Sequence, residues 1–216
     1  MSELRLAIVG FGKIAHDQHV PAIAATDGVT LVAVADPNPV TADVPHFRSL
    51  EALLRDGPEI DAVALATPPQ IRRAQATIAL AARKHVFMEK PPARAVTEIA
   101  PLVTAAREAK RTLFQSWHAR FSPAVEPARR LLAERKIERV FINWKEDVRV
   151  WHPGQDWIFE VLVDEKKQSY QSLYRRFVEL VAAGESDVDL SPLQLVADAF
   201  MLGRRREVEA FAWRVS

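Results

Sequence analysis

The stretch from residue 4 to residue 36 restricts the fold more than any other part of the chain. An apolar run over residues 4–9 is short enough to be a buried strand, and it leads directly into the sequence GFGKIA at residues 10–15, where a helical pattern begins. A second apolar run, residues 30–35, ends on Asp36. Strand, glycine turn, helix, strand and acid in this order match the fingerprint of a dinucleotide-binding βαβ unit, with alanine in place of the third glycine.

The residue types in the glycine turn suit a pyrophosphate. Gly10 permits the tight turn, and Gly12, which lacks a Cβ atom, allows close approach to the backbone. The amides and the dipole at the helix start favour the negative charge. Asp36 can accept hydrogen bonds from the adenosine ribose and would repel a 2′-phosphate, and neither Pro37 nor Asn38 supplies a basic residue. We therefore expect NAD as the preferred cofactor and NADP as the weaker alternative.

Another interpretation of the same stretch stays open at this point. A glycine-rich turn can occur in a βαβ unit that binds no dinucleotide, and Asp36 would then be an ordinary loop acid.

Strands and helices continue to alternate as far as residue 118. The expected strands are 61–66, 85–88 and 112–116, and the expected helices are 13–25, 49–55, 70–83 and 96–110. This alternation is typical of an α/β fold with a parallel, doubly wound Rossmann sheet. Ligands bind outside the carboxyl ends of the strands in such a sheet. We therefore expect one edge to carry the candidate residues Gly10, Asp36, Thr67, Lys90 and His118.

The pattern changes after residue 122. The sequence predicts helices over 122–136, 169–183 and 191–202, strands over 140–151 and 157–163 that form a β-hairpin, and a solvated connector at 165–168. We therefore predict a dinucleotide-binding Rossmann domain at residues 1–122. A second, α+β domain of hairpin and terminal helices would follow at residues 123–216.

Composition excludes several classes of partner. The net charge of +1 gives no reason to expect nucleic acid or an anionic membrane surface, and no apolar run approaches membrane-spanning length. The chain has no cysteine, which excludes disulfide and thiolate chemistry, and its first residues enter a strand without room for a signal peptide. These features fit a cytoplasmic protein.

Two further patterns have both a functional and an ordinary interpretation. His16 and His19 are spaced i, i+3 and could bind a metal, but no third ligand stands nearby, so we expect no metal site. The basic run at 204–206 could meet a phosphate, although a solvated helix face is the more frequent role of such a run.

Short motifs stand at the ends of the expected strands. They are GFGKIA at 10–15, VADPNP at 34–39, LATPP at 65–69, MEKPP at 88–92, Trp117-His118, and WHPGQDW at 151–157. Together they resemble the Gfo/Idh/MocA oxidoreductases. Within that family, WHPGQDW and the segment 172–211 resemble the bacterial aldose 1-dehydrogenases that act on D-galactose and L-arabinose.

The resemblance implies a sugar oxidoreductase, which would oxidise a small-molecule aldose at C1 to the lactone by hydride transfer to NAD. It assigns Lys90 as the catalytic residue, beside the reacting hydroxyl. The implied substrate-binding residues are His118, Glu146, Trp151 and His152. The implied cofactor-binding residues are Gly10, Gly12, Lys13, Ile14, Asp36, Thr67, Pro68, Glu89 and Lys90.

The chain departs from the family pattern after Glu160. The family continues there through a glycine-rich segment, a helix with an Asp and an Asn near the sugar, and most of a second sheet, whereas this chain passes directly to its terminal helices. The resemblance therefore implies a large internal deletion, which makes residues 123–216 a truncated α+β domain for substrate binding or dimerisation. Two alternatives follow from it: a catalytically inactive NAD-binding module, or an interaction partner of a full-length relative. The hairpin at 139–163 would have an exposed edge, which predicts a homodimer formed through it.

Overall fold

The computed structural model describes residues 3–123, 125–133 and 163–202. Several predictions lie outside these residues and stay predictions: residues 139–162 of the expected hairpin with Glu146, Trp151 and His152, and the basic run at 204–206. The last residue of that hairpin, Val163, was expected in a strand but is the first residue of a helix.

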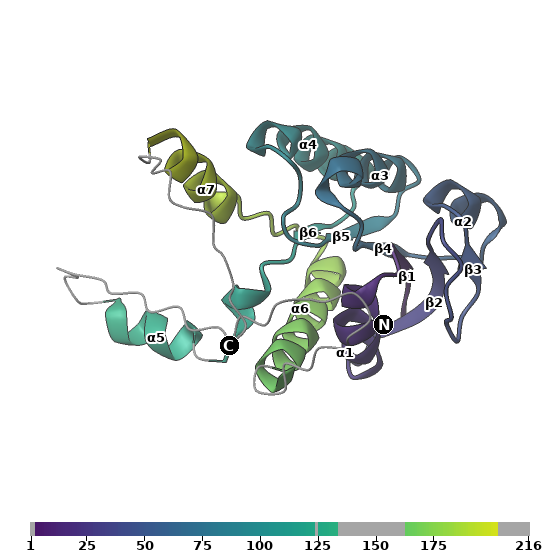
Figure 1. The fold of residues 1–216 in the computed structure, drawn as a ribbon, viewed down its shortest axis with the longest axis horizontal. Coiled ribbons are helices and arrows are strands. Elements are labelled where there is room, and N and C mark those ends of the chain that lie inside the picture. Colours follow the sequence, from purple (N-terminus) through teal and green to yellow (C-terminus); the bar gives the residue numbers. More distant parts are fainter. Residues whose placement is uncertain (1–2, 124, 134–162, 203–216) are drawn as a thin grey trace, which may run out of the picture.

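The core of the fold is a six-stranded parallel sheet in the order β3-β2-β1-β4-β5-β6, which confirms the α/β doubly wound fold (Figure 1). The strands are β1 (Leu4–Val9), β2 (Val29–Ala35), β3 (His46–Phe47), β4 (Ala62–Leu65), β5 (His85–Met88) and β6 (Leu113–Gln115). The strand order changes direction between β1 and β4, and this is where a doubly wound sheet opens a crevice at its carboxyl edge. The short β3 was not expected, since two residues are too few to show a periodicity.

Helices cover both faces of the sheet (Figure 1). One face packs against α2 (Leu50–Asp56), α3 (Pro69–Ala81) and α4 (Ala100–Ala109). The other packs against α1 (Val20–Ala24), the π-helical turn Ala15–His19 that precedes it, and α6 (Val163–Ala183). Almost every side chain of the central strands is buried, as expected for a parallel sheet with helices on both sides.

Helix α6 comes from the carboxyl-terminal part of the chain, yet it belongs to the hydrophobic core of the sheet. Its buried side chains are Tyr170, Leu173, Tyr174, Phe177 and Leu180, spaced three and four residues apart on one face. The ring of Tyr174 stacks on Phe87 of β5 at 4.9 Å, and the ring of Phe177 stacks on Phe114 of β6 at 6.0 Å. These contacts anchor α6 to the middle of the sheet.

The start of α6 corrects one prediction. Residues 165–168 were expected to form a solvated connector, but α6 already begins at Val163. The residues involved are polar and show no apolar periodicity, yet Glu, Lys and Gln are good helix formers and extend the helix by propensity.

The expected helix over 13–25 also differs in detail. It consists of the π-helical turn followed by α1, with Pro21 at the start of α1, where a missing amide proton does no harm.

The remaining elements are 3₁₀ turns at Val96–Glu98 and His118–Phe121, α5 (Val125–Leu132) and α7 (Ser191–Leu202). No helix among the described residues is long and apolar enough to span a bilayer. The proposed domain division at residue 122 stays a prediction.

Phe177→Ala tests the role of α6 in the core. The side chain of Phe177 is fully buried against the sheet, so we expect the substitution to lower the free energy of unfolding by about 3–5 kcal/mol. Urea unfolding followed by circular dichroism measures it. Val125→Ala on α5, where the side chain is 39% exposed, is the control and should change stability by less than about 1 kcal/mol. Equal effects would show that α6 is not part of the sheet core.

Candidate functional site

The glycine turn after β1 is shaped by its contact with the end of β4. Gly10 has a φ of +87°, and a Cβ atom placed on it would lie 2.8 Å from both Cγ2 and the backbone nitrogen of Thr67. Any side chain at Gly10 would therefore be strained and would collide with this turn. A Cβ atom on Gly12, in contrast, would meet no atom within 4 Å. The space above Gly12 is open to a ligand.

Asp36 fixes this glycine turn from the end of β2. Its Oδ2 accepts a hydrogen bond of 2.8 Å from the backbone amide of Phe11, and its Oδ1 accepts 2.9 and 3.2 Å bonds from the backbone and side chain of Asn38. A carboxylate has about four acceptor positions, so Oδ2 retains one of them. Asp36 can therefore hold the turn and still receive a hydroxyl group.

A cavity of about 200 Å³ lies beside Asp36 and Gly10, between β1, β2 and α3. Its wall includes Thr67 and Ile71, and one side is formed by Arg48, which follows β3. The Arg48 guanidinium donates a 2.5 Å hydrogen bond to the carbonyl of Pro37. The sequence next to Asp36 offers no basic residue, but the fold brings one there from twelve positions downstream.

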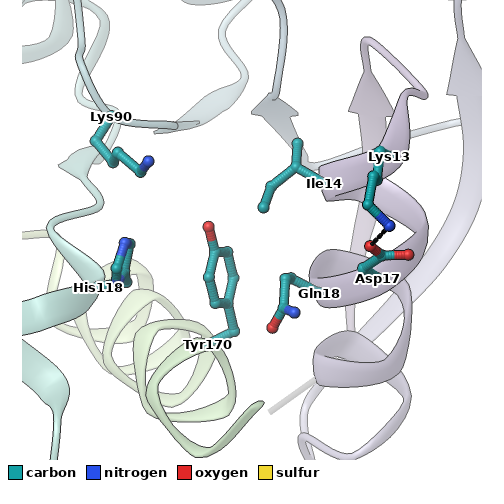
Figure 2. A pocket seen from close by; sticks show the side chains of 7 residues that line it. All are labelled: Lys13, Ile14, Asp17, Gln18, Lys90, His118 and Tyr170. Atoms are coloured by element: carbon teal, nitrogen blue, oxygen red, sulfur yellow. Dashed lines mark hydrogen bonds and ion pairs between the residues drawn. The ribbon is translucent and has the colours of Figure 1, made fainter. Parts of the chain in front are cut away.

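A second cavity of about 360 Å³ lies on the other side of the glycine turn. It is lined by Lys13, Ile14, Asp17, Gln18, Lys90, His118 and Tyr170. Figure 2 shows Lys90 and His118 on one side of this cavity, Ile14 and Gln18 on the other, and the ring of Tyr170 between them. Lys13 points to its rim, where its amine pairs with Asp17 at 2.5 Å.

Below this cavity lies a buried polar network centred on Glu89, whose side chain is only 4% exposed. Glu89 Oε1 accepts a 2.7 Å hydrogen bond from the Tyr170 hydroxyl and lies 3.3 Å from Nε2 of His19. Nδ1 of His19 lies 2.6 Å from the hydroxyl of Tyr174. Glu89 Oε2 accepts a 2.9 Å bond from the backbone amide of Lys90. The network thus joins the π-helical turn, the end of β5 and α6.

The charge of Glu89 is stabilised by its partners. Burial by itself would raise the pKa of Glu89, but the interactions with His19 and the hydrogen bonds from Tyr170 and the Lys90 amide outweigh it and lower the pKa. Burial, together with the nearby Glu89 carboxylate, raises the pKa of Tyr170 above its usual value. Glu89 is therefore ionised and Tyr170 protonated at neutral pH.

Arg72 on α3 connects the turns that follow β4 and β5. The side chain is buried, and its guanidinium donates hydrogen bonds to the carbonyl oxygens of Thr67, Glu89 and Pro91. Burial lowers the pKa of Arg72 to about 10, an effect that the Glu89 charge opposes, so Arg72 is charged at neutral pH. It holds the backbone on both sides of Lys90 in place.

The two histidines of the π-helical turn contact different groups. His16 packs its ring against Phe11 at 4.3 Å, while His19 is buried in the Glu89 network. Within the part of the chain that the structure describes, no group of three His, Cys, Asp or Glu residues could hold a metal ion.

The described candidate residues all lie around the carboxyl edge of the sheet. Gly10, Asp36 and Thr67 border the first cavity, whereas Lys13, Ile14, Lys90 and His118 border the second. Pro68 lies exposed beside Thr67, and Gly12 lies in the turn between the cavities. Glu89 is buried, and its Oε2 accepts a hydrogen bond from the backbone amide of Lys90. Whether these residues bind ligands stays a prediction.

Sequence reasoning missed four residues of this region: Gln18, Arg48, Arg72 and Tyr170. Nothing in the local sequence separates the buried Arg72 from the exposed Arg73 beside it. Tyr170 lies 80 positions beyond Lys90, and only the packing of α6 on the sheet brings them to one cavity.

A pyridine dinucleotide fits these features. The open space above Gly12 admits a pyrophosphate, and a cavity lies on each side of the turn for the two nucleoside halves. Asp36 retains an acceptor position for a ribose hydroxyl.

Comparison with known proteins gives a consistent result. Residues 4–116 match the model of a family described as an oxidoreductase family with an NAD-binding Rossmann fold, Gfo/Idh/MocA. Galactose 1-dehydrogenase of Pseudomonas fluorescens is 33% identical, and the alignment covers 98% of this chain and 99% of that protein. The alignment extends over 305 positions, whereas this chain has 216 residues, so it skips a long segment that this chain lacks.

Solved structures agree with this comparison. The crystal structure of D-galactose-1-dehydrogenase from Rhizobium etli has a TM-score of 0.86 and 36% identity, over 98% of this chain and 99% of that one. WlbA dehydrogenase from Chromobacterium violaceum, crystallised with NADH and UDP-GlcNAcA, has a TM-score of 0.58 and 28% identity. That match covers 65% of this chain and 43% of the WlbA chain.

Arg72→Met tests the connection between the two turns. It removes three charge-assisted hydrogen bonds and leaves buried carbonyl oxygens without partners, so we expect the free energy of unfolding to fall by about 3 kcal/mol or more. Urea unfolding measures the loss. The control is Arg73→Met, the same change at the exposed neighbouring position, which should cost less than about 1 kcal/mol. If the two variants are equally stable, Arg72 does not hold these turns.

Proposed function

The chain belongs to the Gfo/Idh/MocA oxidoreductase family, and we propose that it binds NAD and oxidises an aldose of the D-galactose or L-arabinose type at C1 to the lactone. The observation that carries the proposal is the shared cavity at the carboxyl edge of the sheet. Lys90 and His118 enter it from the ends of β5 and β6, next to the glycine turn. The similarity to galactose 1-dehydrogenase over nearly the whole chain supports the choice of substrate class.

The residues around the glycine turn would hold the dinucleotide. The backbone at Gly10 and Gly12 would receive the pyrophosphate, and Asp36 would bind the adenosine ribose. Thr67 and Pro68 would border the adenosine half, and Lys13 and Ile14 the nicotinamide half. The oxidised nicotinamide, when bound, supplies the hydride acceptor.

The chain's own side chains would then manage the sugar and its proton. As the hydride leaves C1 with its electron pair, the C1 hydroxyl must lose its proton so that the C1–O bond becomes the carbonyl of the lactone. Lys90 Nζ would take this proton, since it points into the cavity. His118 would bind a sugar hydroxyl and orient the ring. Glu146, Trp151 and His152 would complete the sugar site, and they lie outside the described residues.

The missing segment favours a second candidate function. Because this chain lacks a long stretch that its galactose dehydrogenase relative has, groups that position the sugar could be absent. Loss of such groups can reduce turnover by orders of magnitude. The chain would then be a dinucleotide-binding module without turnover, or would pair with another chain through the predicted hairpin at 139–163.

Lys90→Met separates these functions. With NAD and D-galactose, L-arabinose or D-fucose, we expect the wild type to form NADH, measured by absorbance. The variant should lose at least about 100-fold in kcat because the proton acceptor is gone, with its NAD affinity within about threefold of wild type. Lys84→Met, which changes a lysine bonded to the carbonyl of Ile60 away from the cavity, is the control. NAD binding without NADH formation from any sugar would select the binding module. Absence of NAD binding would refute both the oxidoreductase and the binding module and leave only an interaction partner.

Asp36→Ala tests the cofactor preference. We expect the wild type to bind NAD more tightly than NADP, because Asp36 repels a 2′-phosphate. The substitution should lower the ratio of NAD affinity to NADP affinity by about tenfold, measured by calorimetry. The reason is that Arg48 borders the same cavity and can then pair with the 2′-phosphate. Adding Arg48→Met to Asp36→Ala should weaken NADP again while leaving NAD almost unchanged. Tighter binding of NADP by the wild type would contradict the prediction.

A further inference from the structure

His118 enters the second cavity from a segment that does little to fix the direction of its side chain. It is the first residue of the 3₁₀ turn His118–Phe121, which follows β6 beyond the last strand pairing of the sheet. Rotation of an imidazole ring about its last side-chain bond is broad, so the backbone alone does not determine where the two ring nitrogens point. A histidine that orients a sugar needs a support that holds its ring.

The ring of Tyr170 on α6 lies against His118. The 3₁₀ turn packs on α6, and the two rings stack with their centroids 5.8 Å apart and their planes inclined by 21°. Figure 2 shows the rings side by side, below the amine of Lys90. Stacking of this kind favours one plane for the imidazole and so limits the directions that its nitrogens can take.

Tyr170 is itself held in place by the buried network. Only 1% of the residue is exposed, its hydroxyl donates a 2.7 Å hydrogen bond to Oε1 of Glu89, and its ring meets the ring of His19 edge to face at 5.3 Å. Oε2 of the same carboxylate accepts the hydrogen bond from the backbone amide of Lys90. One carboxylate therefore links the support of His118 to the support of Lys90, although these two residues follow different strands.

We propose that Tyr170 is a positioning residue, which fixes the plane of the His118 ring and holds that ring in a set position relative to Lys90. The inference rests on the proposed function, in which His118 binds a sugar hydroxyl and Lys90 takes the proton of the C1 hydroxyl. Tyr170 acts through these two residues and does not itself bind the sugar. Since a small displacement of a group that orients the substrate can strongly reduce the rate, the Tyr170 ring affects the reaction beyond its share in the stability of the core.

Nuclear magnetic resonance of the free protein tests the ring contact without cofactor, sugar or turnover. The wild type should show nuclear Overhauser effects between the ring protons of His118 and Tyr170, with the His118 signals identified by their loss in His118→Gln. Tyr170→Phe keeps the ring and should leave the His118 signals near their wild-type positions, whereas Tyr170→Met should shift them because the ring current is lost. Absence of the Overhauser effects in the wild type would overturn the inference, whether or not Tyr170→Met folds.

Steady-state kinetics with NAD and D-galactose test the consequence for the sugar. We expect Tyr170→Met to raise the KM for the sugar about tenfold, with the Kd for NAD within about threefold of wild type, because the support of His118 is lost. Tyr170→Phe should recover most of this loss, since it restores the ring. A change confined to the stability of the protein would not separate these two variants in KM.

Phe177→Met is the matched control on the same helix. It removes a fully buried ring that stacks on Phe114 and is outside the set of residues lining the second cavity. This variant should keep the KM for D-galactose within about twofold of wild type, although it weakens the core.

The outcomes separate the inference from the proposed function. An equal rise in KM for Tyr170→Met and Phe177→Met would show a purely structural role, and an unchanged KM in Tyr170→Met would show no role at all. Either result would overturn the inference and leave the proposed function standing. If the wild type forms no NADH with D-galactose, L-arabinose or D-fucose, the proposed function fails, and the role of Tyr170 in orienting a sugar fails with it.

Discussion

The buried carboxylate of Glu89 is the interaction on which the site depends. It lies at the end of β5 and has partners in three different directions. Its oxygens accept hydrogen bonds from Tyr170 on α6 and from the backbone amide of Lys90, and Oε1 lies 3.3 Å from Nε2 of His19 in the π-helical turn. A charge removed from water is tolerated only with such partners. Each of these partners comes from a different element. The interactions that stabilise the buried Glu89 carboxylate therefore also fix how these elements pack against one another.

This constraint explains why a distant helix is part of the site. Helix α6 is separated from β6 by a long stretch of chain, yet it fills one face of the sheet with aromatic side chains and sends Tyr170 to the rim of the cavity. The Rossmann sheet would otherwise expose Phe87 and Phe114, which are fully buried here. A chain that lacks a segment before α6 can therefore still complete this layer, as long as α6 is kept.

The sequence was informative where the chemistry is local. The glycine turn, Asp36 and the strand ends before Thr67, Lys90 and His118 follow from short patterns, because a parallel sheet brings the ends of its strands to one edge. The side chains that come from elsewhere could not be found in this way. Arg48 borders the Asp36 cavity because it follows the two-residue strand β3, and Tyr170 lines the second cavity because α6 packs on the sheet. Neither arrangement leaves a recognisable pattern in the amino-acid sequence.

The π-helical turn shows how a local irregularity serves the site. The sequence predicted one regular helix over 13–25, but the structure widens its first turn to i→i+5 bonding over Ala15–His19. Gln18 and His19 are adjacent in the chain and both are buried, one lining the cavity and the other reaching Glu89 beneath it. The turn therefore supplies both the wall of the cavity and part of its support. An irregular turn of this kind is less stable than a regular one, and its presence at the cavity is consistent with a binding role for this part of the chain.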